Sequence, residues 1–272
     1  MLELKNGDIA SGSLDKSIII TRFIGQEVTY YRLINHTDRI TSMIELKNGN
    51  LATGSQDMTI TVWNLNDKQP KYKLIGHKST VESLDLLPNK SNELISASSD
   101  GNIIVWDLRG AIIKYTINIA YTILTIKSFP DSESILVGTT NGKIIIINLK
   151  NKMIEYMLSE EIGKIRSIVL LEDNLIASSN GKNINIWNLN DRHKIYQLRG
   201  HKEDIFSLFL LSNGYLASGS FDNSIRIWNL ENGKSELQLF DNQTKLSCLL
   251  ALKNGILLSG GYDNLIVIWR LF

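Results

Sequence analysis

One segment of thirteen residues recurs seven times along the chain at a nearly constant interval. Two of its copies are TGSQDMTITVWNL at 53–65 and SGSFDNSIRIWNL at 218–230. The interval is 40 to 43 residues, measured at the eleventh residue of each copy, which is Thr21, Trp63, Trp106, Ile147, Trp187, Trp228 or Trp269. All five Trp of the chain fall at this one position. A fixed period of this length indicates a repeat architecture whose units fold alike and stack on their neighbours.

Each repeat is predicted to contain four short β-strands and no helix. Apolar, β-branched runs such as LASGS and SIRIWNL are separated by tight turns, and Asn-Gly and Asp-Gly dipeptides mark further hairpins. No window carries the sustained apolar period of about 3.6 residues that a helix would show. One such sheet cannot cover its own faces, so neighbouring sheets must stack. The predicted fold is all-β, a seven-bladed β-propeller of four-stranded antiparallel blades.

We expect one domain over residues 1–272, with first and last blades that are incomplete. Met1 aligns with Met43, so the first strand of blade 1 is entered midway, and LIVIWRLF ends blade 7 on its third strand. Because a bare strand edge is unfavourable, we expect a segment upstream of Met1 to complete the last blade; the alternative is an open edge. The predicted blades are approximately 1–34, 35–75, 76–118, 119–159, 160–199, 200–240 and 241–272.

The repeats resemble those of the WD-repeat family, whose unit opens with Gly-His, has an Asp in the turn between its second and third strands, and closes with Trp-Asp. Gly76-His77, Asp100 and Trp106-Asp107 carry the whole pattern. The resemblance implies a buried chain of hydrogen bonds that joins His, Asp, Trp and a Ser or Thr of the second strand. That hydroxyl is expected from Thr53 or Ser55, from Ser96 or Ser98, and from Ser218 or Ser220. The implied network residues are His36, Asp57, Trp63, His77, Asp100, Trp106, His201, Asp222 and Trp228.

In the same family, partner peptides often dock on the top face of the propeller, and the resemblance implies which residues lie there. Phe206, Phe221 and Tyr262 are expected to lie together on blades 6 and 7, a composition typical of an interaction site. The alternative is that Phe206 and Phe221 only pack against each other. A peptide with an apolar anchor beside acidic or phosphorylated residues would suit the site. The other residues implied for partner binding are Arg166, Lys164, Lys245, Asp204, Arg39 and Gln56.

Nothing in the sequence indicates catalysis, and we expect no enzyme activity, no cofactor and no metal. The turn Asp residues recur once per blade and are spread over the repeats, so they do not form an acid–base pair. Cys248 is expected to be a small buried hydrophobic residue and His193 an exposed turn residue without a role. No Gly-rich turn is followed by the helix that phosphate binding needs.

Charge and composition narrow the class of partner. The 29 Lys and Arg balance 28 Asp and Glu, which argues against bulk nucleic-acid binding, and no apolar run approaches the length of a membrane span. A single Cys excludes a disulfide framework, so we expect a cytoplasmic or nuclear protein. The predicted function is a non-catalytic protein-interaction scaffold that acts as a monomer within a larger complex. The alternative is a substrate-recognition subunit of a complex such as a ubiquitin ligase, with its adaptor-binding part upstream.

Overall fold

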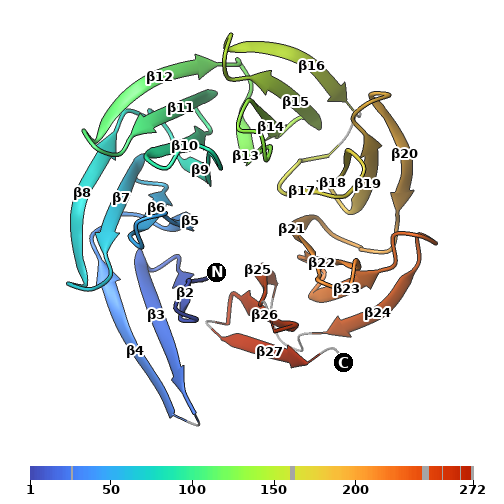
Figure 1. Ribbon diagram of the computed structural model, residues 1–272. Coiled ribbons are helices and arrows are strands. Elements are labelled where there is room, and N and C mark those ends of the chain that lie inside the picture. The colour runs from blue at the N-terminus through green and yellow to red at the C-terminus, as the bar shows by residue number, and fades with distance from the viewer. Residues whose placement is uncertain (26, 160–162, 241–244, 253, 264, 271–272) are drawn as a thin grey trace. The chain divides into compact units, whose positions relative to one another are not determined.

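The computed structural model describes residues 1–25, 27–159, 163–240, 245–252, 254–263 and 265–270. Within these ranges every regular element is a β-strand, because short β-branched runs alternate with tight turns. The strands form seven antiparallel sheets, of which six have four strands and one has three (Figure 1). The prediction of an all-β fold built from seven mostly four-stranded blades is therefore confirmed. No helix in the described ranges is long and apolar enough to cross a bilayer.

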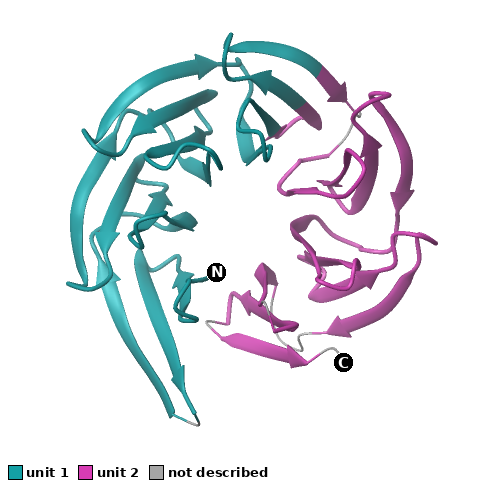
Figure 2. Ribbon diagram, in the orientation of Figure 1, with its two compact units in different colours: residues 1–137, 145–156 teal, residues 138–144, 157–272 magenta. Residues whose placement is uncertain are grey.

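The chain divides into two compact units (Figure 2). Unit 1 comprises residues 1–137 and 145–156, and unit 2 comprises residues 138–144 and 157–272. We number the sheets as blades 1 to 7 in chain order. Blades 1 to 3 belong to unit 1, blades 5 to 7 belong to unit 2, and blade 4 contributes residues to both. The description of the chain as one domain stays a prediction.

Within each blade the strands are hydrogen-bonded in chain order, so every neighbouring pair forms a hairpin. Blade 1 contains β1 (Leu2–Glu3), β2 (Ile9–Gly12), β3 (Ser17–Ile24) and β4 (Glu27–Ile34). Blade 2 contains β5 (Ile40–Glu45), β6 (Leu51–Ser55), β7 (Thr59–Asn64) and β8 (Gln69–Ile75). Blade 3 contains β9 (Val81–Leu86), β10 (Glu93–Ser98), β11 (Asn102–Asp107) and β12 (Ile112–Asn118). Blade 4 contains β13 (Ile123–Ser128), β14 (Ser134–Thr139), β15 (Lys143–Asn148) and β16 (Met153–Ser159).

The three blades of unit 2 repeat this order. Blade 5 contains β17 (Ile168–Leu170), β18 (Leu175–Asn180), β19 (Asn183–Asn188) and β20 (His193–Leu198). Blade 6 contains β21 (Ile205–Leu210), β22 (Leu216–Ser220), β23 (Ser224–Trp228) and β24 (Ser235–Phe240). Blade 7 contains β25 (Leu246–Ala251), β26 (Ile256–Gly261) and β27 (Ile266–Arg270). The first strand of blade 1 has only two residues, but this blade has four strands. Blade 7 has three strands in the described residues, as predicted for the last blade.

The core of each unit lies between neighbouring blades, and in blades 2 to 6 the second and third strands are buried on both faces. In unit 1, Ile60 and Val62 of blade 2 pack with Val81 and Trp106 of blade 3. In unit 2, Ile225 and Ile227 of blade 6 pack with Leu246, Leu249 and Leu257 of blade 7. Isoleucines take over where blade 4 lacks the Trp, since Ile145 and Ile147 are completely buried against blade 3. Stacking thus supplies the hydrophobic burial that a single sheet lacks.

The turn between the second and third strands requires a left-handed residue directly after its Asp. Gly101 meets this requirement in blade 3 with φ of 80°, whereas blade 2 has Met58 with φ of 67°. An L-residue with a side chain is unfavourable in this region, and the Met58 side chain is 46 % exposed, so it contributes little packing.

Met58→Gly is therefore expected to raise the free energy of unfolding by about 0.5 kcal/mol, because relief of the left-handed strain exceeds the entropy cost of glycine. Urea unfolding of the whole chain measures this change. Met153→Gly is the matched control, because Met153 is also an exposed methionine but begins strand β16. The control should lose stability, and a loss in both variants would contradict the strain argument.

Candidate interaction site

Three blades contain a buried chain of hydrogen bonds that runs from Trp to Asp. In blade 6, Trp228 Nε1 donates to Ser218 Oγ at 2.8 Å, and Ser218 Oγ lies 2.7 Å from His201 Nε2. His201 Nδ1 lies 2.9 Å from Asp222 Oδ2. The Ser hydroxyl accepts from Trp, and when it also donates to Nε2, the imidazole is neutral and its Nδ1 proton faces the carboxylate.

The same chain occurs in blades 2 and 3. His36 lies 2.8 Å from both Thr53 Oγ1 and Asp57 Oδ2, and Trp63 donates to the same Thr53 hydroxyl at 2.9 Å. In blade 3 the same groups come from Ser96, His77, Asp100 and Trp106. The Ser96 hydroxyl lies 2.7 Å from His77 Nε2 and 2.8 Å from the Trp106 indole nitrogen. An Asp100 carboxylate oxygen lies 3.4 Å from His77 Nδ1. All three His are buried.

Blades 5 and 7 retain only the first link of this chain. Trp187 donates to Ser178 and Trp269 donates to Ser259, each at 2.9 Å. Gly181 stands at the position of the turn Asp in blade 5. These two blades therefore lack the carboxylate–imidazole pairing in the described part of the chain, which fits a structural role for the network rather than a catalytic one.

The carboxylates of the network are ionised over a wide pH range. Burial alone would raise the pKa of Asp57, but hydrogen bonds from Thr59, the Thr37 amide and His36 lower it to about 2. The pKa of Asp222 is lowered in the same way, against the effect of burial. Burial lowers the pKa of His77, and the nearby Asp100 carboxylate opposes this only in part.

Acidification is therefore expected to destabilise the fold in two steps. A group whose folded pKa is depressed contributes stability that is present above its unfolded pKa and lost as the pH falls toward the folded value. For His77 this loss begins below about 6.5, and for Asp57 it falls between about 3.8 and about 2. After discounting for solvent, the Asp57 step is worth about 1–2 kcal/mol.

Urea unfolding at intervals from pH 8 to pH 4 tests the upper step. His77→Gln should remove the decline that begins near 6.5, and His193→Gln should leave it, since His193 is exposed at the start of β20. A stability that increases from pH 7 to pH 5 in the unchanged chain would contradict the expected sign.

A recurring main-chain hydrogen bond joins two positions at which residues implied for partner binding stand. The amide of the residue before the turn Asp donates to the carbonyl oxygen of the residue before the first strand. Gln56 donates in this way to Arg39 at 3.0 Å, Phe221 donates to Asp204 at 3.0 Å, and Tyr262 donates to Lys245 at 3.2 Å. The loops before the first strand and after the second therefore form one edge in each of these blades.

In unit 2 this edge carries a compact group of aromatic and charged side chains. The rings of Phe206 and Phe221 stack with centroids 5.6 Å apart. The Arg166 guanidinium lies 5.8 Å from the Phe221 centroid, and its Nε lies 3.9 Å from Asp204 Oδ2. That Nε is buried and has no hydrogen-bond acceptor in the described part of the chain. We call these four residues the Arg166 cluster.

Phe206 is less available than the repeat pattern suggested. It packs against the core between blades 6 and 7, and a Cβ placed on Gly219 would approach its Cζ and Leu249 to 2.8 Å. Phe221 is half-buried, and Tyr262 is 53 % exposed. Among the described residues no hydrogen bond, ion pair or ring contact joins Tyr262, Lys245 or Lys164 to the Arg166 cluster, and Lys164 and Lys245 are exposed.

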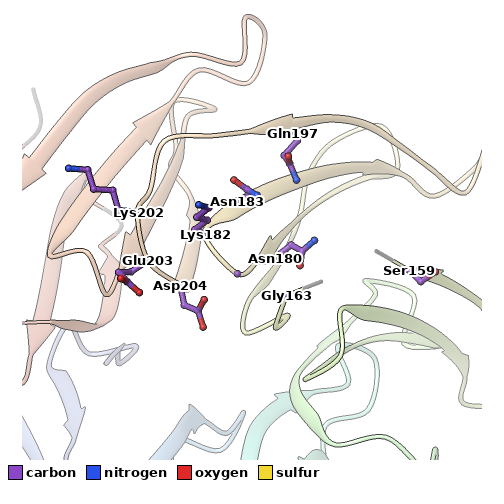
Figure 3. Close-up of a pocket in the computed structure, with 10 residues that line it drawn as sticks. Ser159, Gly163, Asn180, Lys182, Asn183, Gln197, Lys202, Glu203 and Asp204 are labelled. Atoms are coloured by element: carbon purple, nitrogen blue, oxygen red, sulfur yellow. The ribbon is translucent and has the colours of Figure 1, made fainter. Parts of the chain in front are cut away.

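A cavity of about 740 Å³ opens beside Asp204, and the repeat pattern did not predict it (Figure 3). Gln197 lines it and donates to Asn185 Oδ1 at 2.7 Å. The one signal in the sequence is Gly181, which stands where other blades have Asp. The cavity is lined by Ser159, Gly163, Asn180, Gly181, Lys182, Asn183, Gln197, Lys202, Glu203 and Asp204.

Two further positions bear on chemistry. Cys248, expected to be buried, is only half-buried, and its Sγ lies 3.9 Å from the Gly260 carbonyl oxygen. The described residues contain no group of three or more His, Cys, Asp or Glu that could hold a metal ion.

The fold defines the class of protein, which is a seven-bladed β-propeller. The solved WD40 β-propeller domain of Doa1 superposes with a TM-score of 0.87 over 97 % of this chain and 90 % of that one, at 21 % identity. The WD domain, G-beta repeat model matches residues 27–64, 68–107 and 192–229. Three segments of the chain are thus similar to WD repeats, and the fold is that of a WD40 β-propeller.

Curated relatives match part of the chain at moderate identity. E3 ubiquitin-protein ligase COP1 of Arabidopsis thaliana is 26 % identical over 60 % of this chain and 25 % of its own length. A guanine nucleotide-binding protein subunit beta of Solanum tuberosum is 28 % identical over 55 % of this chain and 44 % of its own length. The U3 small nucleolar RNA-associated protein 15 homolog of Xenopus tropicalis is 29 % identical over 55 % and 28 %. The chain thus spans less than half the length of these relatives.

Proposed function

We propose that this protein is a non-catalytic scaffold that binds partner proteins or peptides on the loop edge of unit 2. The Arg166 cluster carries the proposal. It places a cation with a buried, unpaired N–H beside a half-buried aromatic ring, and aromatic and Arg residues dominate the binding energy of protein interfaces. The three segments that match the WD-repeat model support a protein-binding role, since WD-repeat propellers generally bind protein partners.

The proposed ligand is a segment with an apolar anchor and an adjacent acidic or phosphorylated group. Phe221 would contact the anchor, and Arg166 would exchange its 3.9 Å approach to Asp204 for a closer carboxylate or phosphate. Lys164, Lys245 and Tyr262 would surround the segment. Rigid β-blades hold these groups in place before binding, which lowers the cost of association.

Affinity capture from the lysate of the source cell, followed by mass spectrometry, tests the site. Phe221→Ala/Arg166→Ala should weaken retention of the true partner by about thirty-fold or more, as expected for hot-spot residues. Phe206 is kept intact because it also stabilises the core. The matched control is Arg39→Ala/Gln56→Ala in blade 2, which should retain the partner. Loss in the control alone would move the site to blade 2 and refute the Arg166 cluster.

A second candidate function is substrate recognition within a larger complex such as a ubiquitin ligase. The similarity to COP1, which its name describes as an E3 ubiquitin-protein ligase, favours it. Ligase subunits among the captured proteins would support this function, and their absence would favour a free scaffold. We further propose a cytoplasmic location, with the nucleus as the alternative, a monomer within its complex, and no nucleic-acid, membrane or cofactor binding.

A further inference from the structure

The outer hairpin of blade 1 is longer and more regular than its counterparts. Strands β3 and β4 pair in one continuous register from Ser17↔Ile34 to Ile24↔Glu27. In blades 2, 3, 5 and 6 the register of the equivalent pair shifts at the Trp, as it does between Val62 and Trp63. Their third strands end at the Trp or one residue later, whereas β3 continues for three residues beyond Thr21. Figure 1 shows β3 and β4 running past β2 as a two-stranded ribbon.

The hairpin also differs at the Trp position. Thr21 stands there in place of Trp, and no register shift interrupts the pairing at this residue. The last pair between β2 and β3 is Ile9↔Thr21, and beyond it the ribbon has only two strands. We call residues 21–24 and 27–30 the blade 1 arm.

One face of the arm is apolar and open to solvent. Phe23 lies opposite Val28, and Thr21 lies opposite Tyr30, so these four side chains share a face. Tyr30 is 72 % exposed, Val28 56 % and Phe23 50 %. Contiguous exposed apolar side chains on a strand ribbon mark an interaction surface.

The opposite face holds the arm in place. The Arg22 guanidinium donates to both oxygens of the buried Asp8 carboxylate, with its closest contact at 2.8 Å. The hydrogen bond from Arg22 lowers the pKa of Asp8 despite the effect of burial. The Tyr31 hydroxyl reaches the Leu65 carbonyl oxygen of blade 2 at 3.5 Å, and Lys68 lies over the Tyr31 ring. The open face is therefore presented by an anchored element.

The outer edge of β4 lacks the features that block other sheet edges. It has eight residues without Pro, pairs with no fifth strand in the described sheet, and has Glu27 and Arg32 as its only charges. Natural edge strands are blocked by charged residues, Pro and bulges. Tyr30 precedes the half-buried Tyr31, and the equivalent position is charged in four of the five other outer strands, whereas β20 has Ile195 there. The four charged residues are Lys71 in β8, Lys114 in β12, Glu155 in β16 and Glu236 in β24.

We propose that the edge of β4 binds an extended segment of a partner protein as an added antiparallel strand. Unpaired backbone N–H and C=O groups select an extended strand as the occupant, and alternate side chains give specificity. Apolar residues would lie opposite Val28 and Tyr30, an acidic residue opposite Arg32, and a basic residue opposite Glu27. Arg32 also pairs with Asp15, but 48 % of its side chain stays exposed.

Charge complementarity favours this occupant over a second copy of the chain. Directly opposed residues of antiparallel strands lie on the same face of the sheet. Side chains alternate between the two faces along a strand, so two copies of β4 related by a two-fold axis pair odd-numbered residues with odd and even-numbered residues with even. The two residue numbers of each opposed pair therefore add up to an even number. Glu27 and Arg32 sum to an odd number and never meet. When the two copies pair about residue 30 or about residue 31, at the middle of β4, Arg32 lies opposite Val28 or opposite Tyr30. In neither arrangement does a basic residue lie opposite Glu27.

The test uses the whole chain and a capped synthetic peptide, Val-Thr-Glu-Thr-Val-Thr-Ile-Lys, whose residues would oppose 34 down to 27. Amide hydrogen exchange should slow by about ten-fold or more over residues 27–34 at saturating peptide. Tyr30→Lys installs the charge found in β8 and β12, and it should abolish the protection. Ile75→Lys is the matched control, because Ile75 lies in β8 and is 73 % exposed; it should leave the protection unchanged.

Three results would overturn the proposal. The first is absence of protection at any peptide concentration. The second is equal protection by a peptide with Glu and Lys exchanged, which should bind at least about five-fold more weakly because it opposes like charges. The third is protection of the same amides without peptide that increases with protein concentration and accompanies a doubled mass, since a second copy would then be the occupant. None of these results depends on the Arg166 cluster of unit 2.

Discussion

Replacing Trp228 by alanine is expected to lower the free energy of unfolding by about 3–5 kcal/mol. The indole is 2 % exposed and packs with Leu198, Ile205 and Leu208 between blades 5 and 6. Its removal leaves a cavity that neighbouring β-strands cannot collapse to fill. It also removes the donor to Ser218, whose hydroxyl is part of the hydrogen-bond chain.

Urea unfolding monitored by circular dichroism measures this loss. Trp269→Ala is the matched control, because Trp269 makes the same hydrogen bond to Ser259 but is only half-buried in blade 7. The control should lose less than half as much stability, since less apolar surface returns to water. Equal losses in the two variants would show that the burial of the indole does not determine the loss in free energy of unfolding.

Asp222→Ala is expected to cost about 2–4 kcal/mol, because it leaves several buried donors without an acceptor. The carboxylate accepts from His201 Nδ1 at 2.9 Å, from the Lys202 amide at 2.8 Å, and from the Ser224 hydroxyl at 2.7 Å. A truncation that leaves donors unsatisfied costs more than the net value of the hydrogen bonds themselves.

Asp263→Ala separates this network effect from the effect of the turn. Asp263 holds the same turn position in blade 7 and accepts from the Leu265 amide at 3.0 Å, but the blade has no His in its sequence. Its loss should cost about 1 kcal/mol or less, as for a single exposed turn hydrogen bond. Similar costs for the two substitutions would assign the stabilisation to the turn alone.

The hydrogen-bond network shows what the alternation of side chains along a strand can and cannot predict. Thr53 and Ser55 are two residues apart, so they lie on the same face of β6 and the pattern cannot choose between them. In the structure Thr53 binds His36, whereas the Ser55 hydroxyl donates to the Asp38 carbonyl oxygen at 3.0 Å. Which of the two hydroxyls reaches the imidazole depends on the position of the ring along the strand, and only the folded structure shows that position.

The candidate interaction site shows a larger difference between what the repeat pattern predicts and what the structure adds. The phase of the repeat places Phe206 and Phe221 at corresponding edges of adjacent loops, and their rings do stack. The position within the repeat does not predict how deeply each ring is buried, because the burial of Phe206 depends on Leu249 of the next blade. The cavity beside Asp204 had no signal beyond Gly181, since its walls come from several strands and loops that only folding brings together.

The number of blades and their antiparallel strands could be predicted from the sequence alone. These follow from the period of the Trp residues and from local turn chemistry, which act over a few residues. Only the folded structure shows which hydroxyl joins each His, how exposed Phe206 is, and that β3 and β4 extend as an open arm. Those features depend on distances and burial that are set by tertiary packing, as between Phe206 and Leu249 of the next blade, and a local pattern does not encode them.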